Sequence, residues 1–319
     1  MLRRLVGAAA AVALLLGSTA CTDPRPVTVR PPIAWNTAPD TDEQRLAVLA
    51  AARAIDPCAL IPHDQLGELG TVLSVAASAP DTCAAELNST EFGKKTRLSW
   101  SLSVSAEPPD KFPGGVESRI GDATVVSERD SEPDPGVQIH SCMATAWFPV
   151  TVGIFLQVST PVADKPCAVV DRVLPGALDR LRTQPVVGTS PDTPKTRLAD
   201  ADPCAVLSRL GVSTPVDKQY LHACVFEYRG TTVDLQYLYD QRGIVAQGEP
   251  ILVVNGHPGY DLRSLTETSW YGAILGPPLT SAEPPSTLGP RVPVVKLMGR
   301  DPAVLREVLG HTAELFPAT

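Results

Sequence analysis

The chain has 319 residues, of which 44% are hydrophobic, and a formal net charge of −8 at pH 7. At the usual length of roughly 100–200 residues per domain, the sequence predicts two domains, each able to bury a hydrophobic core. Lys and Arg form no cluster after residues 3 and 4. The basic surface of a nucleic-acid-binding protein is therefore missing, and we expect no nucleic-acid partner.

Residues 1–21 have the order of a secretory signal peptide. Arg3 and Arg4 precede an apolar run at residues 5–16, and small residues then lead to Cys21. The apolar run has 12 residues, fewer than the roughly 18 that a membrane-spanning helix needs. We therefore expect this segment to direct export and not to remain as a transmembrane anchor.

At Cys21 the sequence resembles a bacterial lipoprotein signal, in which this cysteine is acylated, for example with palmitate, and becomes the new N-terminus. The lipoprotein pattern has an aliphatic residue three places before the cysteine, whereas this chain has Ser18. Ordinary cleavage after Ala20 is thus the alternative. The chain has 7 Cys, and a lipid on Cys21 leaves six that can pair completely. The resemblance implies an exported protein, held by lipid on the outer face of the cytoplasmic membrane.

Residues 22–41 are rich in proline and lack apolar periodicity, which predicts an extended tether between the membrane and the folded part. Thr41 and Gln44 then match a capping box, and apolar residues of helical period follow them. This pattern predicts a helix over residues 42–54.

A second proline-rich stretch, residues 183–195, separates two units that resemble each other. The first unit, residues 42–182, contains Asp56-Pro57-Cys58, and the second, residues 196–319, contains Asp202-Pro203-Cys204. In both motifs Asp can cap a helix, and Pro suits the first turn because a missing N–H costs nothing there. The stretch between them therefore reads as a linker.

The two units also end alike. Residues 165–174 match residues 301–309 with one gap, and both segments have an apolar stripe of helical period. Between the helices the period changes to two, most clearly at residues 98–105 and 232–239, which predicts half-buried antiparallel strands. Further strand candidates are residues 123–127, 142–148, 153–158, 224–229, 251–254, 270–275 and 292–297. We therefore predict an α+β fold in which each unit is a disulfide-stapled antiparallel sheet with helices on one face.

Four of the remaining six cysteines occupy equivalent places in the two units. Cys83 follows Cys58 by 25 residues, and Cys224 follows Cys204 by 20 residues. Six cysteines allow 15 connectivities, and the repeat selects the pairs Cys58–Cys83 and Cys204–Cys224. In the chain-entropy model each such bridge stabilises the fold by about 3 kcal/mol.

The last two cysteines have no counterpart in the second unit. Cys167 corresponds to Ala303, and Cys142 falls near Thr268 or Ser269. Because both cysteines are missing together from the second unit, we predict the disulfide Cys142–Cys167. A redox-active pair, the alternative, would favour Cys-x-x-Cys, which the chain lacks.

The lipoprotein signal, the two Asp-Pro-Cys helix starts and the paired downstream cysteines together resemble an uncharacterised lipoprotein domain family of the actinobacterial cell envelope. The resemblance covers residues 55–181 and, in a shorter version, residues 201–316. It implies a lipid-attached cysteine, a short tether and no established reaction. In architecture the chain is also similar to the extracellular sensor domains of actinobacterial receptor kinases, but it has no kinase motif. Any sensing would therefore need a separate partner.

We expect no catalysis, cofactor or metal site. The sequence has no Gly-x-Ser-x-Gly elbow, Ser-x-x-Lys, His-Glu-x-x-His, Walker loop or Gly-x-Gly-x-x-Gly. Residues 130–136 place acids before a Gly as a calcium loop does, but Ser141 stands where such a loop needs a bidentate Glu, which favours a solvated hairpin. The histidines have no metal-ligand spacing, and a zinc site assembled in space is the alternative. They are His63, His140, His222, His257 and His311.

All 6 Tyr fall between Tyr220 and Tyr271, in the second unit. Tyrosine is enriched at interfaces, because it is apolar yet can form hydrogen bonds. The second unit is therefore predicted to carry the recognition face, and the alternative is that Tyr237 and Tyr239 close the sheet core. The predicted ligand-binding residues are Tyr228, Tyr237, Tyr239, Tyr260, Trp270 and Tyr271.

The leading functional hypothesis is a lipid-anchored, non-catalytic binding or sensing module of the cell envelope. Its partners would be the membrane, through the N-terminal lipid, and an envelope protein or ligand. One alternative is an envelope hydrolase or transferase without a recognisable motif, which a deep pocket with clustered acid, His and Ser groups would favour. A second alternative is an accessory subunit of an envelope complex.

Overall fold

The computed structural model describes residues 32–105, 114–130, 136–262, 268–280 and 286–317. The chain from Pro32 to Thr319 is one compact unit that contains both sheets. The predicted signal peptide, Cys21, residues 22–31 of the tether and residues 131–135 of the acidic stretch lie outside the described residues. In the described part, no helix combines the length and the apolar character needed to cross a membrane.

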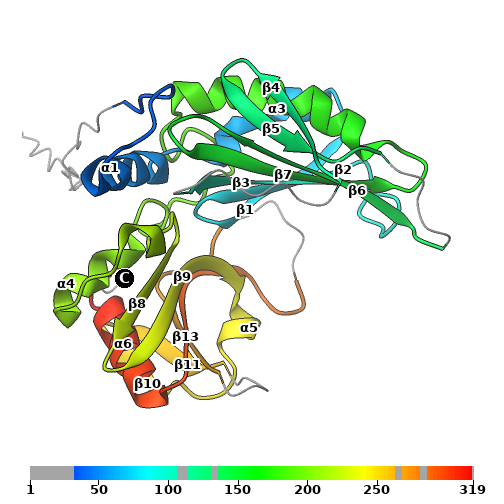
Figure 1. The fold of residues 1–319 in the computed structure, drawn as a ribbon. Coiled ribbons are helices and arrows are strands. Elements are labelled where there is room, and N and C mark those ends of the chain that lie inside the picture. The colour runs from blue at the N-terminus through cyan, green and yellow to red at the C-terminus, as the bar shows by residue number, and fades with distance from the viewer. Residues whose placement is uncertain (1–31, 106–113, 131–135, 263–267, 281–285, 318–319) are drawn as a thin grey trace, which may run out of the picture. The chain divides into compact units, whose positions relative to one another are not determined.

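The first sheet has seven antiparallel strands in the order β1-β2-β3-β7-β6-β5-β4 (Figure 1). Helix α3 (Pro166–Thr183) packs on β6 and β7 through its buried apolar stripe, as its period predicts. The strands are β1 (Val72–Ala79), β2 (Thr82–Leu87), β3 (Thr96–Val104), β4 (Val116–Ile120), β5 (Ala123–Ser127), β6 (Ile139–Trp147) and β7 (Val152–Pro161). Three short helices precede them: α1 (Asp42–Arg53), η1 (Cys58–Leu60) and α2 (His63–Gly67).

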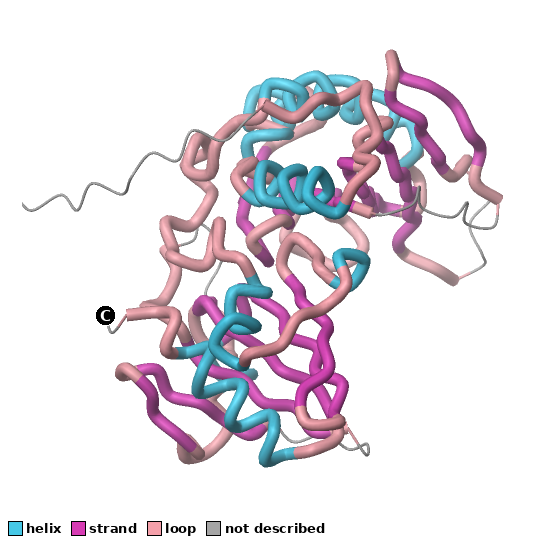
Figure 2. The backbone as a smooth tube through the Cα atoms, turned by 60° about the vertical axis from the view of Figure 1, so that its left-hand side comes forward, coloured by secondary structure: helices cyan, strands magenta, loops and turns pink. Residues whose placement is uncertain are grey.

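The second sheet has six antiparallel strands in the order β10-β11-β12-β13-β9-β8. Helix α6 (Pro302–Ala313) packs on β12 and β13, and Figure 2 shows helices beside the strands in both halves of the chain. The strands are β8 (Ala223–Tyr228), β9 (Thr231–Gln241), β10 (Leu252–Val254), β11 (His257–Asp261), β12 (Ser269–Ile274) and β13 (Arg291–Gly299). The short helices are η2 (Pro203–Val206), α4 (Leu207–Leu210), η3 (Val216–Lys218) and α5 (Arg242–Val245).

The two sheets share one topology. The order β2-β3-β7-β6-β5-β4 in the first sheet corresponds strand by strand to β8-β9-β13-β12-β11-β10 in the second. Strand β1 is an additional strand at the edge of the first sheet. The predicted α+β class, with antiparallel sheets in disulfide-stapled units, is therefore confirmed.

The structure contains three disulfides, and they are the three pairs predicted from the repeat. Cys58–Cys83 joins the first Asp-Pro-Cys turn to β2, and Cys204–Cys224 joins the second to β8, with Cα–Cα distances of 5.2 and 5.3 Å. Cys142–Cys167 joins β6 to the first turn of α3, with a Cα–Cα distance of 5.1 Å. These distances are typical of disulfides.

The strand register identifies the positions that replace the third disulfide in the second unit. Cys142 pairs with Val158, and its counterpart Ser269 pairs with Gly299. Cys167 is the second residue of α3, as Ala303 is the second residue of α6. The second unit therefore has a vacant disulfide position between Ser269 and Ala303.

We expect the double variant Ser269→Cys/Ala303→Cys to form a fourth disulfide. It should raise the free energy of unfolding by about 3 kcal/mol, because the bridge restricts the unfolded chain. Urea unfolding with and without reductant measures the gain, and thiol titration counts free cysteines. Ser269→Cys alone is the control and should show no reductant-dependent gain. Two free thiols in the folded double variant would contradict the equivalence of these positions.

Two residues of the predicted tether, Ile33 and Trp35, pack against the first sheet and the segment after α3. Ile33 is buried, and its N–H donates to Gln184 Oε1 at 3.3 Å. The ring of Trp35 packs edge-on against Phe148, with centroids 4.8 Å apart. Proline content predicted an extended chain here, but these two apolar side chains bind it to the first sheet.

Candidate functional site

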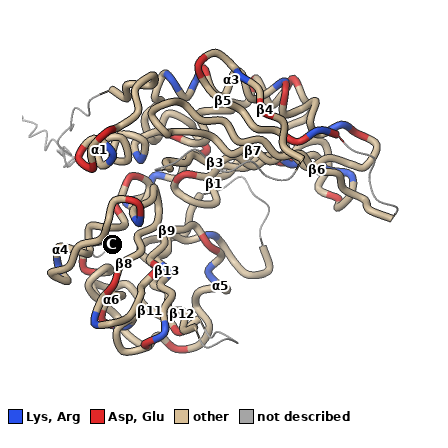
Figure 3. Tube along the Cα trace, viewed as in Figure 1, with Lys and Arg blue, Asp and Glu red and all other residues tan. Residues whose placement is uncertain are grey.

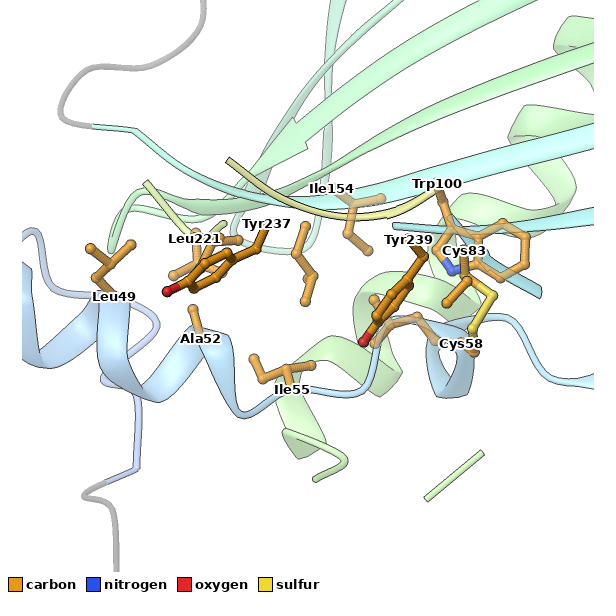
Figure 4. Packing of buried hydrophobic residues seen from close by; sticks show 14 of the residues in the cluster. Leu49, Ala52, Ile55, Cys58, Cys83, Trp100, Ile154, Leu221, Tyr237 and Tyr239 are labelled. Atoms are coloured by element: carbon orange, nitrogen blue, oxygen red, sulfur yellow. A yellow bond between two sulfur atoms is a disulfide. The ribbon is translucent and has the colours of Figure 1, made fainter. Parts of the chain in front are cut away.

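Two tyrosines of β9 pack against elements of the first half of the chain. Tyr237 is 1% exposed and Tyr239 is 2% exposed. Figure 4 shows Tyr237 beside Leu49, Ala52 and Leu221 and Tyr239 near Ile55 and the Cys58–Cys83 disulfide. All of these residues belong to one hydrophobic cluster. The two sheets therefore share a core.

Arg53, at the end of α1, adds polar contacts to the segment before β8 and to Asp202 of the second Asp-Pro-Cys turn. Its Nε donates to Leu221 O and its Nη2 to Tyr220 O, both at 3.1 Å. Its Nη1 lies 3.1 Å from Asp202 Oδ1. The Arg53 side chain is 8% exposed, so these contacts form in a largely desolvated environment, where they are stronger than at the surface.

An ion pair also joins the β1–β2 turn to the segment before β8. His222 Nδ1 lies 2.5 Å from Asp81 Oδ2, and the Asp81 side chain is 8% exposed. Burial alone lowers the pKa of His222, but the close contact with the negative charge of Asp81, together with the charge of Asp234, raises that pKa above its ordinary value of 6.5.

This pair predicts a pH dependence of stability. Because the pKa of His222 is higher in the folded chain than in the unfolded chain, its stabilising contribution is complete below about pH 6.5 and is lost as pH rises through the folded pKa. We expect the wild-type urea midpoint to fall over that window and the His222→Asn variant to fall less. The His222 side chain is 31% exposed, so solvent screening keeps the difference small. Identical pH profiles for both chains would contradict the assignment.

The linker is held by the first Asp-Pro-Cys motif. The carboxylate of Asp56, which is 0% exposed, accepts the backbone N–H groups of Gly188 and Ser190, both at 2.9 Å. It also accepts the N–H of Ala59 at 3.2 Å and the hydroxyl of Thr193. The sequence predicted only a linker here. Three of these donors, those of Gly188, Ser190 and Thr193, belong to the linker and hold it against the first unit.

The fixed linker forms one wall of a pocket of about 470 Å³, which we call the linker groove. Pro191 and residues 193–198 form this wall, and residues 275–280, which follow β12, form the other. Pro293, Phe316 and Pro317 complete the lining. A second pocket of about 270 Å³ adjoins the groove along β1 and shares Pro191, Pro194, Leu279 and Thr280 with it. The volume of the groove fits a small-molecule site.

The rim of the linker groove carries positive charge. Lys195 and Arg197 are exposed, and neither has an ion-pair partner among the residues that the structure describes. The nearby acid, Asp192, is paired with His63: Asp192 Oδ2 lies 2.8 Å from His63 Nε2. Figure 3 shows acidic and basic residues interspersed along the described chain, so the local pair at the groove is not part of a general basic surface.

A further pocket of about 340 Å³ lies between α1 and η3. Arg45 and Asp217 line it with opposite charges, and Tyr220, which is 40% exposed, lies at its edge. Arg45 also contacts Asp42 at 3.4 Å. This pocket has no unpaired cation pair like that of the linker groove, so we take the groove as the candidate site.

The predicted face of six aromatic side chains does not form. Tyr237, Tyr239, Tyr260 and Tyr271 are buried, because the period of two along their strands turns them into the cores. Tyr228 and Trp270 are partly exposed but lie on β8 and β12, which two other strands separate. None of the six lines the linker groove.

Tyr228 has a local partner of its own. Its hydroxyl donates to Glu307 Oε1 at 2.9 Å. This hydrogen bond raises the pKa of Tyr228 above its ordinary value. Its partner lies on α6, so the hydroxyl is engaged in holding that helix to the second sheet.

The linker groove was not predicted from the sequence, although the proline-rich linker and Pro277-Pro278 were its signal. The histidines are dispersed; His257, for example, is buried and its Nε2 lies 3.1 Å from Phe316 O. In the described ranges, no group of three or more His, Cys, Asp or Glu side chains could hold a metal ion. In comparisons with known proteins, the chain matches no family model, no curated protein and no solved structure.

Proposed function

We propose that the protein is a lipid-anchored, non-catalytic binding module on the outer face of the cytoplasmic membrane, and that it binds its ligand in the linker groove. The observation that carries this proposal is the groove itself. Its volume lies in the range of about 300–1,000 Å³ that is typical of ligand sites, its linker wall is fixed by Asp56, and two cations on its rim lack partners among the described residues.

In this proposal, acylation of Cys21 tethers the chain to the membrane through the residues that precede Ile33. A ligand that occurs at or near the membrane surface would therefore be within reach of the folded unit.

Metabolic labelling with an alkyne fatty acid tests the anchor. The wild-type chain should carry the label and fractionate with membranes, and the Cys21→Ser variant should do neither. A wild-type protein that is exported without label would refute the anchor and leave a secreted form of the same fold.

A photo-crosslinking amino acid tests the groove on intact cells. It would replace Pro277 or Thr280, two exposed residues that line the groove, and in the control it would replace Ser118, which is exposed on β4. Mass spectrometry should find the same adduct at both groove positions and not at Ser118. Adducts that are equal at all three positions, or absent from all three, would contradict a ligand site in the groove.

A further inference from the structure

We propose that the ligand of the linker groove is an amphiphile with one anionic headgroup. Lys195 and Arg197 would bind the headgroup, while Leu279, Pro293 and Phe316 contact the apolar part. This inference rests on the proposed function of the groove and adds the chemical class of its ligand.

The case for an anionic headgroup starts from Thr196, which separates the two cations. The hydroxyl of Thr196 lies 3.1 Å from Tyr239 Oη, and Leu198 beyond it is buried. This anchoring holds the segment in place while Lys195 and Arg197 stay exposed on the groove. A guanidinium and an ammonium at one rim favour a carboxylate or phosphate, which accepts charge-assisted hydrogen bonds from both.

The nearby carboxylate does not neutralise these cations. Asp192 is 14% exposed in its side chain and contacts His63. It also accepts the hydroxyl of Ser190 at 3.2 Å. The positive charge at the groove is therefore available to a ligand.

The proline content of the walls favours an apolar chain over a peptide. Proline has no backbone N–H, and six prolines line the groove: Pro191, Pro194, Pro277, Pro278, Pro293 and Pro317. Two of their carbonyls are already used, because Pro194 O accepts the N–H of Thr196 at 2.9 Å and Pro293 O accepts that of Leu275 at 2.8 Å. A peptide would leave main-chain groups unpaired here, at a cost that an alkyl chain does not have.

The adjoining pocket bears on where the ligand can lie. It shares four lining residues with the groove. Val75, Ala76 and Ala77 of β1 line the second pocket with small apolar side chains. Asp192 and Arg291 also line this second pocket, so the apolar part of the ligand is expected to lie mainly in the groove, against Leu279, Pro293 and Phe316.

Titration of the full-length Cys21→Ser chain with fluorescent cis-parinaric acid tests the proposal. Competition by dodecanoate and by dodecyl phosphate separates a carboxylate from a phosphate source, and dodecyl maltoside is the neutral probe. We expect both anions to displace the fluorophore and the neutral probe to do so much less. In Lys195→Glu/Arg197→Glu the affinity should fall about tenfold or more, because both charge-assisted contacts are lost.

The matched control, Arg119→Glu/Lys218→Glu, makes the same charge change at two exposed residues away from the groove and should stay within about twofold of wild type. Equal binding of neutral and anionic probes, unchanged affinity in the groove variant, or tighter binding of a Glu-rich peptide would overturn the inference. If anionic probes fail while the crosslinkers at Pro277 and Thr280 still capture a shared adduct, the ligand class is wrong and the binding function stands. If the anionic probes fail and the crosslinkers capture no shared adduct, both the ligand class and the binding function are refuted.

Discussion

Replacing Asp56 with alanine is expected to lower the free energy of unfolding by about 3–5 kcal/mol, because four donors lose a buried, charged acceptor. The carboxylate is completely buried and binds linker residues more than 130 positions away in the sequence. The equivalent change in the second motif, Asp202→Ala, should cost about 1–2 kcal/mol. Asp202 caps the N–H of Cys204 and contacts Arg53, but its side chain is 48% exposed.

Urea unfolding of both variants measures the difference, and hydrogen exchange locates it. In Asp56→Ala the amides of Gly188 and Ser190 should exchange at rates close to those of an unfolded chain, since both lose their acceptor. The amides of the second motif should be unaffected. Equal losses of unfolding free energy in the two variants would show that the linker does not depend on the first motif. The claim that Asp56 fixes one wall of the groove would then be refuted.

Tyr237 provides the second large effect. Truncation to alanine should cost about 3–5 kcal/mol, because the ring fills the core shared by both sheets. The ring also packs edge-on against Phe316, with centroids 5.8 Å apart. Tyr237→Phe should be neutral or stabilising by about 1 kcal/mol, because the Tyr237 hydroxyl is buried without a hydrogen-bond partner in the described part of the chain.

The control for Tyr237 is Tyr228→Phe, which removes the hydrogen bond to Glu307 and should destabilise by about 0.5–1.5 kcal/mol. The two hydroxyl deletions thus have opposite predicted signs in the same urea experiment. Burial holds the pKa of Tyr237 above its ordinary value, so the wild-type hydroxyl stays protonated across the usual pH range. A destabilising Tyr237→Phe change would show that the hydroxyl has a partner and would contradict this description of the core.

The features that could be predicted from the sequence are those that depend on local hydrophobic periodicity and on the internal repeat. The alternation at residues 98–105, the stripe of α3 and the loss of Cys142 and Cys167 in the second unit are local patterns, and each has the expected structural counterpart. Strands β1, β2, β4 and β11 were missed. The small and polar residues of β1, for example, give no clear period, and its place at the edge of the sheet comes from pairing with β2.

The candidate site was harder to predict because its causes are not local. The tyrosines of the second unit were predicted to form a recognition face, but composition does not specify which face of a strand a residue occupies, and four of them are buried. The linker was recognised from its prolines, yet its fixed position comes from Asp56, far away in the sequence. The position of residues 191–198 depends both on Asp56 and on which faces of the strands are buried. These determinants lie far apart in the chain, so no short stretch of sequence contains both.

Native mass spectrometry of the protein extracted from membranes tests the central claim most directly, because one spectrum reports both the anchor and the ligand. We predict a chain that begins at Cys21, carries acyl groups and three disulfides, and retains a noncovalent adduct. The adduct should be missing from Lys195→Glu/Arg197→Glu and present in Arg119→Glu/Lys218→Glu. A wild-type chain with no acyl mass and no adduct, or with an adduct that the groove variant retains, would contradict the account.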